Sequence, residues 1–185
     1  MTAAEYLEIE RAAELKSDYF RGMVIPRAPC NNRHNLIASN MMWIIGNQIR
    51  ERDYFVFGSN MRLKIEAFED YVYPDVSVVF GYGSYEDEKE DNLLNPVVLV
   101  EILSEATEAY DRGDKFQHYQ FLKSLQEYIL IAQDACRVEQ FVRQHDWQWK
   151  YRIYSSLEDV VKLESIDCEL PLKEVYLKVS DLAAS

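Results

Sequence analysis

The chain has 185 residues, of which 48% are hydrophobic and 13% are aromatic, and this composition excludes a disordered chain. The length predicts a single domain, residues 1–185, with a core of its own. The formal net charge of −12 counts against a duplex-binding protein of the usual basic kind, although a local basic patch or a metal ion would still allow nucleic-acid binding.

The cellular compartment is indicated by what the chain does not contain. Its first residues, "MTAAEYLEIE", are acidic and lack the basic region and apolar stretch of a signal peptide. No apolar run reaches the length of a membrane span. The cysteines, Cys30, Cys136 and Cys168, are scattered and have no zinc-binding spacing, as is typical of a reducing cytosol. We therefore expect a cytoplasmic protein that does not contact a membrane.

The N-terminal part predicts a helix, a strand and a second helix. Residues 2–14 have a capping box formed by Thr2 and Glu5. Residues 18–28 indicate a strand entered through a turn at Gly22. Residues 34–52 carry apolar side chains at helical spacing, which predicts an amphipathic helix.

The remainder predicts mostly strands. Residues 96–103 are apolar on both faces, as in the middle of a covered sheet. A helix over 111–125 and a strand over 127–132 would complete a βαβ unit with parallel strands. Further strands are expected within 54–65 and 73–80, an acidic loop over 81–92, and an antiparallel hairpin from 137–144 and 147–154. Together these elements predict an α/β fold with a mixed sheet.

One glutamate, Glu101, interrupts the aliphatic run of residues 96–103, where burying a carboxylate is costly. Asp75 stands at the mouth of the preceding strand, directly after Pro74. Downstream, Asp111 and Lys115 share one face of the predicted helix that follows the strand of Glu101. Two carboxylates on neighbouring strands could hold Mg²⁺, and a lysine beside them could stabilise charge on a phosphate as water attacks.

Several segments of the chain resemble a known family. The sequence is similar to the large bacterial family of putative restriction endonucleases of the Uma-two type, which have the PD-(D/E)XK nuclease fold. The resemblance covers nearly the whole chain and implies a restriction endonuclease-like fold, with a central mixed sheet flanked by helices and an added C-terminal antiparallel hairpin. The segments that carry it are "EYLEIERAAELKSDYFRGMVI", "RHNLIASNM", "YPDVSVVF", "NPVVLVEILSEATEAYDRGDKFQHYQFLKSLQEYILIAQD" and "SIDCELPLKEVY".

The resemblance also implies roles for individual residues. Pro74-Asp75 matches the "PD", and Glu101 matches the second acid. The third position of the "EXK" triplet is Leu103, so the lysine is expected on the following helix as Lys115. Near the N-terminus, "KSDY" stands where many relatives have "K-x-E-Y", and Asp18 is the matching acid.

The activity implied is hydrolysis of DNA phosphodiester bonds with Mg²⁺ or Mn²⁺. Asp75, Glu101 and the backbone carbonyl of Ile102 would bind the metal. Lys115 would orient or help activate the water, and Asp18 would be an auxiliary acid that polarises the lysine or holds a second ion. A homodimer is expected, because two nicks on a duplex need two sites.

Plainer interpretations of the same residues stay open. Asp75 could simply begin a strand. Glu101 could be a structural ion-pair partner of Arg62 or Lys64 on a neighbouring strand. Lys115 could pair only with an acid one helical turn away.

Two further residues have structural interpretations. Asp111 is better explained as a helix N-cap than as a ligand, because it precedes the helical stretch. His34 opens its helix and is more typical of a capping or surface residue than of a catalytic base.

Two alternatives concern the whole protein. A nuclease fold that no longer cuts and serves as a binding or regulatory module is favoured by the net charge and by the lack of any Lys/Arg-rich stripe beside the site. An enzyme acting on a small phosphodiester or on single strands would also tolerate an acidic surface.

Overall fold

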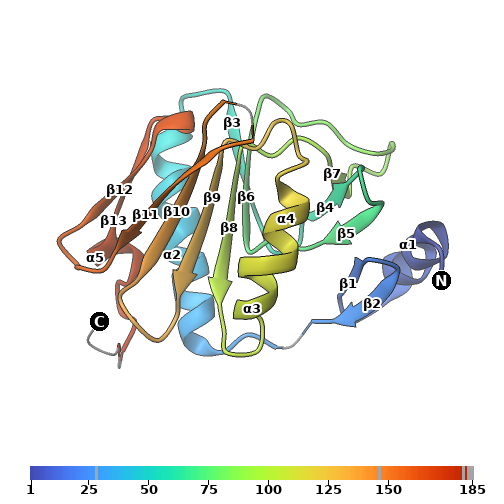
Figure 1. Cartoon of the computed structure of the whole chain (residues 1–185), viewed down its shortest axis with the longest axis horizontal. Coiled ribbons are helices and arrows are strands. Elements are labelled where there is room, and N and C mark those ends of the chain that lie inside the picture. Colours follow the sequence, from blue (N-terminus) through green and yellow to red (C-terminus); the bar gives the residue numbers. More distant parts are fainter. Residues whose placement is uncertain (28, 146, 181, 183–185) are drawn as a thin grey trace.

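The computed structural model describes residues 1–27, 29–145, 147–180 and 182. Helices cover the faces of a central sheet, and a smaller sheet lies toward the N-terminal helix (Figure 1). The π-helical turn η1 joins α3 to α4 into one continuous helical segment. The helices are α1 (Ala3–Ala12), α2 (Asn32–Ile49), α3 (Glu108–Tyr110), η1 (Asp111–Lys115), α4 (Phe116–Tyr119), the 3₁₀ turn η2 (Glu164–Ile166) and α5 (Leu172–Val175).

The central sheet has the strand order β11-β10-β9-β8-β6-β3 within the described residues. Its strands are β3 (Tyr54–Gly58), β6 (Val76–Phe80), β8 (Val98–Leu103), β9 (Glu127–Ala132), β10 (Val138–Arg143) and β11 (Trp149–Tyr154). Strands β8 and β9 are parallel, as predicted for the βαβ unit, and the other neighbours are antiparallel. The mixed sheet and the hairpin of β10 and β11 are therefore confirmed.

The smaller sheet has the order β2-β1-β5-β4-β7. It is formed by β1 (Ser17–Phe20), β2 (Met23–Pro26), β4 (Arg62–Ile65), β5 (Asp70–Val72) and β7 (Asn92–Leu93). Near the C-terminus, β12 (Val160–Leu163) and β13 (Cys168–Pro171) form an antiparallel pair. The smaller sheet was not expected as a separate unit, because its strands are short and only their long-range pairing joins them.

The alternation of side chains along β8 decides which residues face which layer. Val98, Val100 and Ile102 pack in the same core cluster as the apolar stripe of α2. Leu99 and Leu103 pack in a second cluster with side chains of α4 and β9. Figure 1 shows α2 and the α3–α4 segment on opposite faces of the sheet. Glu101 shares a face with Leu99 and Leu103, so it points toward the α3–α4 segment.

The first helix and the first hairpin show where local sequence signals succeed and where they are incomplete. The capping box of Thr2 and Glu5 is present at the start of α1. The strand predicted over 18–28 is instead the β1–β2 hairpin, and residue 28 lies outside the described residues. Its turn is formed by Arg21 and Gly22, which have φ values of 50° and 78°. Two successive residues with positive φ make a tight hairpin turn, which splits the predicted strand in two.

The helix predicted over 111–125 is displaced toward the N-terminus. The helical segment begins at Glu108 and ends at Tyr119. Asp111 therefore lies inside the helix, and its prediction as an N-cap is wrong. No helix in the described ranges is both long enough and apolar enough to cross a membrane.

Candidate functional site

A cavity of about 480 Å³ lies at the end of β8, between that strand, the η1 turn and the β1–β2 hairpin. The residues predicted as catalytic all line it, and the metal-ligand candidate Ile102 lines it with them. The fold thus brings together side chains from β1, the mouth of β6, β8 and η1. The predicted set is Asp18, Asp75, Glu101 and Lys115.

Asp75 is held by groups from two other elements. Its Oδ2 accepts a hydrogen bond of 2.7 Å from the backbone N–H of Ile102, and its Oδ1 lies 3.1 Å from Nε2 of His34. Burial would raise the pKa of Asp75, but His34 and the Ile102 N–H hold that pKa below its ordinary value. Asp75 is therefore an ionised carboxylate, and His34 is its buried partner rather than the N-cap of α2, a position taken by Asn31.

Glu101 is almost completely buried, with 2% of its surface exposed. Its Oε1 accepts hydrogen bonds from Nζ of Lys115 at 2.9 Å and from the hydroxyl of Tyr119 at 2.7 Å. Burial raises the pKa of Glu101 to about 8, although the charge of Lys115 opposes that rise. The carboxyl group is therefore expected to change its protonation state at slightly alkaline pH and not in the acidic range usual for glutamate.

The structural partners proposed for Glu101 from sequence are engaged elsewhere. Arg62 pairs with Asp91, and Lys64 pairs with Glu86 at 2.6 Å. The alternative interpretation, in which one of them would pair with Glu101, is therefore wrong. The residue that pairs with Glu101 is Lys115 from the helical segment.

Lys115 and Asp111 are brought together by the π-helical turn. Nζ of Lys115 lies 3.0 Å from Oδ1 of Asp111, and 3% of each residue is exposed. Burial would lower the pKa of Lys115, but Asp111 and Glu101 outweigh that effect and raise it well above its ordinary value. The hydroxyl of Tyr128 donates to the backbone oxygen of Asp111 and so anchors the turn to β9. Single π-helical turns inside helices are frequent at functional sites.

Asp18 reaches the cavity from β1. Its Oδ1 accepts a hydrogen bond of 3.1 Å from the backbone N–H of Tyr73 and lies 3.5 Å from Nη1 of Arg27. Burial raises the pKa of Asp18, although Lys115 and Arg27 oppose that rise. Its observed ion pair within the described residues is with Arg27, whereas Lys115 pairs with the other two carboxylates of the site.

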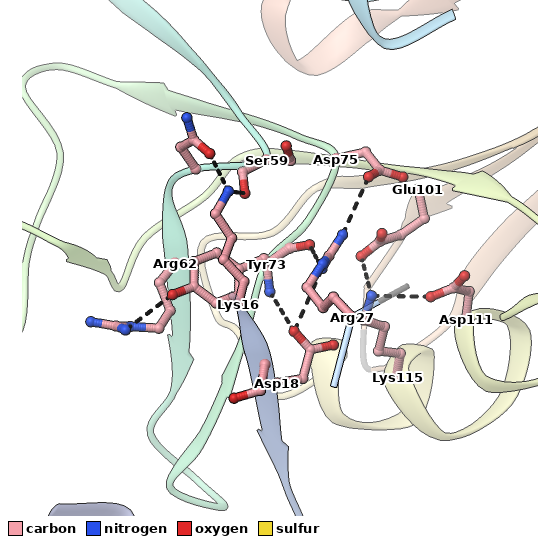
Figure 2. A network of polar contacts seen from close by, with 12 residues as sticks. Lys16, Asp18, Arg27, Ser59, Arg62, Tyr73, Asp75, Glu101, Asp111 and Lys115 are labelled. Carbon is pink, nitrogen blue, oxygen red and sulfur yellow. Dashed lines mark hydrogen bonds and ion pairs between the residues drawn. The ribbon is translucent and has the colours of Figure 1, made fainter. Parts of the chain in front are cut away.

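Arg27 and Tyr119 belong to the site and were not predicted from sequence. The guanidinium of Arg27 lies between Asp18 and Asp75 and donates to the backbone oxygen of Tyr73 (Figure 2). No local spacing marks Arg27, because only the pairing of the smaller sheet brings it to the site. Tyr119 did carry a signal, since it follows Lys115 by one helical turn and must lie on the same helix face.

The donor set fits a hard divalent cation. Both observed hydrogen bonds of Glu101 are accepted by Oε1, which leaves Oε2 for a cation. In an extended strand the C=O and the N–H of one residue point to the same side, so the C=O of Ile102 points toward Asp75, which accepts a hydrogen bond from the Ile102 N–H. The described residues contain no group of three or more His, Cys, Asp or Glu side chains arranged to hold a metal ion. Two carboxylates and one carbonyl match Mg²⁺, which usually keeps several water ligands, better than Zn²⁺.

The chain is similar to known proteins over most of its length. A family model described as "Uma2: Putative restriction endonuclease" matches residues 3–173. The uncharacterized protein sll1609 of Synechocystis sp. is 38% identical over 149 residues, which cover 80% of this chain and 84% of that protein. A second uncharacterized Synechocystis protein, slr1290, is 28% identical over 177 residues, covering 95% of this chain and 91% of its own length.

A solved structure shares the fold. The crystal structure of a putative nuclease belonging to DUF820 from Anabaena variabilis superposes with a TM-score of 0.79, covering 95% of this chain and 97% of that one, at 21% sequence identity. This likeness confirms the restriction endonuclease-like fold. The family match over residues 3–173 establishes the relationship by sequence, and the chain belongs to the Uma2 family of putative restriction endonucleases.

Proposed function

We propose that the protein is a metal-dependent endonuclease that hydrolyses DNA phosphodiester bonds in the cavity lined by Asp75, Glu101 and Lys115. The observation that carries this proposal is the buried pair of Glu101 and Lys115 beside the ionised Asp75. Burying such a pair is costly, and perturbed carboxylates of this kind cluster at functional sites. Membership of the Uma2 family supports the same reaction class.

Asp75, Glu101 and the backbone carbonyl of Ile102 would hold Mg²⁺ or Mn²⁺. When bound, the cation would act as a Lewis acid that stabilises negative charge on the phosphate oxygens. Because burial raises the pKa of Glu101, the cation would compete with a proton for this carboxyl group, and metal binding would release that proton.

Lys115 would act directly on the reacting groups. An ammonium group has three N–H donors, and two of them are directed at Glu101 and Asp111. The third donor would orient the attacking water and stabilise the charge that develops on the phosphate. Asp111 holds the ammonium in place, and Asp18 would be an auxiliary acid that acts through Arg27.

The test is cleavage of supercoiled plasmid, linear duplex and single-stranded DNA with Mg²⁺ and with Mn²⁺. We expect wild-type cutting that needs the metal, and loss of cutting in both Asp75→Asn and Glu101→Gln. Glu169→Gln is the matched control, because the Glu169 side chain is 60% exposed and pairs only loosely with Lys162 at 3.6 Å. Cutting that survives both active-site substitutions would contradict the proposal.

A second candidate is a nuclease-fold protein that binds its ligand without cutting. The net charge of −12 favours it, because most proteins that cut duplex DNA use a basic surface. The same assay separates the two functions. No cutting of any substrate under either metal would support the binding module, and a gel-shift experiment would then show whether its ligand is DNA.

We also propose that the enzyme is cytoplasmic. We further propose that it is a homodimer, because cutting both strands of a duplex requires two active sites. Light scattering coupled to size-exclusion chromatography would distinguish a dimer from the 21.8 kDa monomer. Since a dimer would be needed only for a duplex substrate, a monomeric enzyme would direct attention to single-stranded substrates.

A further inference from the structure

Arg27 places a positive charge between two buried carboxylates of the site, Asp18 and Asp75. It follows β2 and lines the cavity, and 21% of its side chain is exposed. Its Nη1 lies 3.5 Å from Oδ1 of Asp18, and its Nη2 lies 3.5 Å from Oδ1 of Asp75. Figure 2 shows the guanidinium reaching between these two carboxylates, while the ammonium of Lys115 contacts Glu101 and Asp111. Arg27 therefore neutralises the acids that Lys115 does not contact.

The two carboxylate contacts of Arg27 are weak ones. Charge-assisted hydrogen bonds between nitrogen and oxygen are usually about 2.7–2.9 Å long, so contacts of 3.5 Å leave the guanidinium loosely held by each acid. Its close contact is with the backbone oxygen of Tyr73, which does not change its charge. The acids can therefore exchange Arg27 for another cation while the side chain stays at the cavity.

We propose that Arg27 is an exchangeable counter-ion. In the metal-free protein it pairs with Asp75 and Asp18, and a divalent cation that binds Asp75 displaces it. The released guanidinium then binds a phosphate oxygen of the substrate, a ligand that its planar array of donors suits well. This inference rests on the proposed metal-dependent hydrolysis, because the displacing cation and the phosphate are those of that reaction.

A purely structural role for Arg27 makes a different prediction. A salt bridge that only holds β1–β2 against the segment of Tyr73 would lower stability when removed, would change metal affinity only through the loss of a nearby positive charge, and would leave the KM for DNA unchanged. An exchangeable counter-ion competes with the metal for Asp75. Removing the guanidinium must then strengthen metal binding, which is an unusual consequence for the loss of a buried ion pair.

The experiment is calorimetric titration of Mn²⁺ into the full chain without DNA. We expect R27Q to bind Mn²⁺ at least about threefold more tightly than the wild type, because the competing charge is gone. R27M is a second neutral variant that keeps the apolar stem, and it should show the same gain. R50Q is the control, since it removes the same charge from an exposed pair with Glu51 on the surface.

The second readout is the KM for DNA cleavage, which should rise about tenfold in R27Q and R27M through loss of one charged phosphate contact. Unchanged or weaker Mn²⁺ binding in whichever of the two variants folds overturns the inference, and so does a KM equal to that of the wild type. A wild-type protein that binds no Mn²⁺ and cuts no DNA contradicts the proposed function itself, which separates the two failures.

Discussion

Nζ of Lys115 and Oε1 of Glu101 meet at 2.9 Å, with only 4% and 3% of their side chains exposed. The two residues come from different elements, β8 and the η1 turn, so their contact joins the sheet to the helical segment. A buried ion pair that loses one member leaves an uncompensated charge in the interior. We therefore expect these two residues to behave as one unit in both stability and catalysis.

Lys115→Met and Glu101→Gln should be non-additive. At pH 9, above the raised pKa of Glu101, Lys115→Met alone should lower the free energy of unfolding by roughly 3–5 kcal/mol, because the ionised Glu101 and Asp111 are left without their counter-charge. Once Glu101 is already neutral, the same lysine substitution should cost at least ~1 kcal/mol less. Urea denaturation of the wild type, both single variants and the double variant measures this coupling. The exposed pair of Lys162 and Glu169 is the control cycle, for which we expect additive effects. Additivity at the buried pair would refute the coupling.

The stability of the metal-free protein should fall as pH rises from about 5 to about 8. The folded-state pKa of Glu101 is raised to about 8 from its ordinary 4.5, so in this window the folded protein holds a proton that the unfolded chain has lost. Stability is then fully present below the unfolded pKa and is lost as pH approaches the folded pKa, by at most about 1.4 kcal/mol per pH unit. The lowered pKa of Asp75 and the raised pKa of Lys115 keep both groups charged throughout the window.

Urea denaturation in EDTA at four pH values between 5 and 8 checks this prediction. Glu101→Gln cannot titrate, so its free energy of unfolding should decline less steeply with pH than that of the wild type. Glu169→Gln removes an exposed carboxylate and should follow the wild type. Parallel curves for the wild type and Glu101→Gln would show that Glu101 does not titrate in this range.

Glu139 should matter for activity although it lies outside the cavity. Its buried carboxylate on β10 accepts hydrogen bonds from Arg112 of the η1 turn at 2.5 Å and from the hydroxyl of Tyr151 at 2.7 Å. Glu139→Ala should lower the free energy of unfolding by roughly 3–5 kcal/mol, because it breaks a partly buried pair. It should also reduce kcat, because the turn that carries Lys115 loses an anchor to the sheet.

The control for Glu139 is the other partner of the same arginine. Glu108 pairs with Arg112 at 2.7 Å along the helix, and its side chain is 49% exposed. Glu108→Ala should cost only about 0.2–0.5 kcal/mol and should leave kcat unchanged. Equal effects of the two substitutions, measured by urea denaturation and plasmid cleavage, would contradict the anchoring role of Glu139.

Two glycine substitutions should have opposite effects on stability. A Cβ added at Gly113, inside η1, meets no atom within 4 Å, so Gly113→Ala should stabilise the protein by about 0.5–1 kcal/mol. A Cβ at Gly22 also meets no atom within 4 Å, but Gly22 has a φ of +78°, which alanine adopts only at a cost. Gly22→Ala should therefore destabilise the protein by roughly 1–2 kcal/mol. Urea denaturation of both variants checks the signs. A destabilised Gly113→Ala would show that the π-helical turn needs the freedom of glycine.

Much of the fold could be predicted from local patterns. The strand at 127–132 coincides with β9, and the capping box at Thr2 and Glu5 begins α1 where expected. These signals depend on side-chain periodicity and on hydrogen bonds between residues a few positions apart. The same local reasoning misplaced Asp111, because an aspartate shortly after a strand has the appearance of an N-cap. Only the packing of Tyr128 and Lys115 around Asp111 makes it an interior residue of the helix.

Some features of the candidate site could likewise be predicted from the sequence, and others could not. The sequence by itself determined that Asp75 stands at the mouth of a strand, that Glu101 lies in the aliphatic run of a later strand, and that a lysine follows on a helix, because chain order and periodicity specify each of these. The tertiary structure alone decided that Arg27 stands between Asp18 and Asp75 and that His34 bonds Asp75. The contact of Arg27 with Asp75 joins the smaller sheet to the central sheet, and the contact of His34 joins α2 to the central sheet. No short-range pattern specifies where separate layers meet.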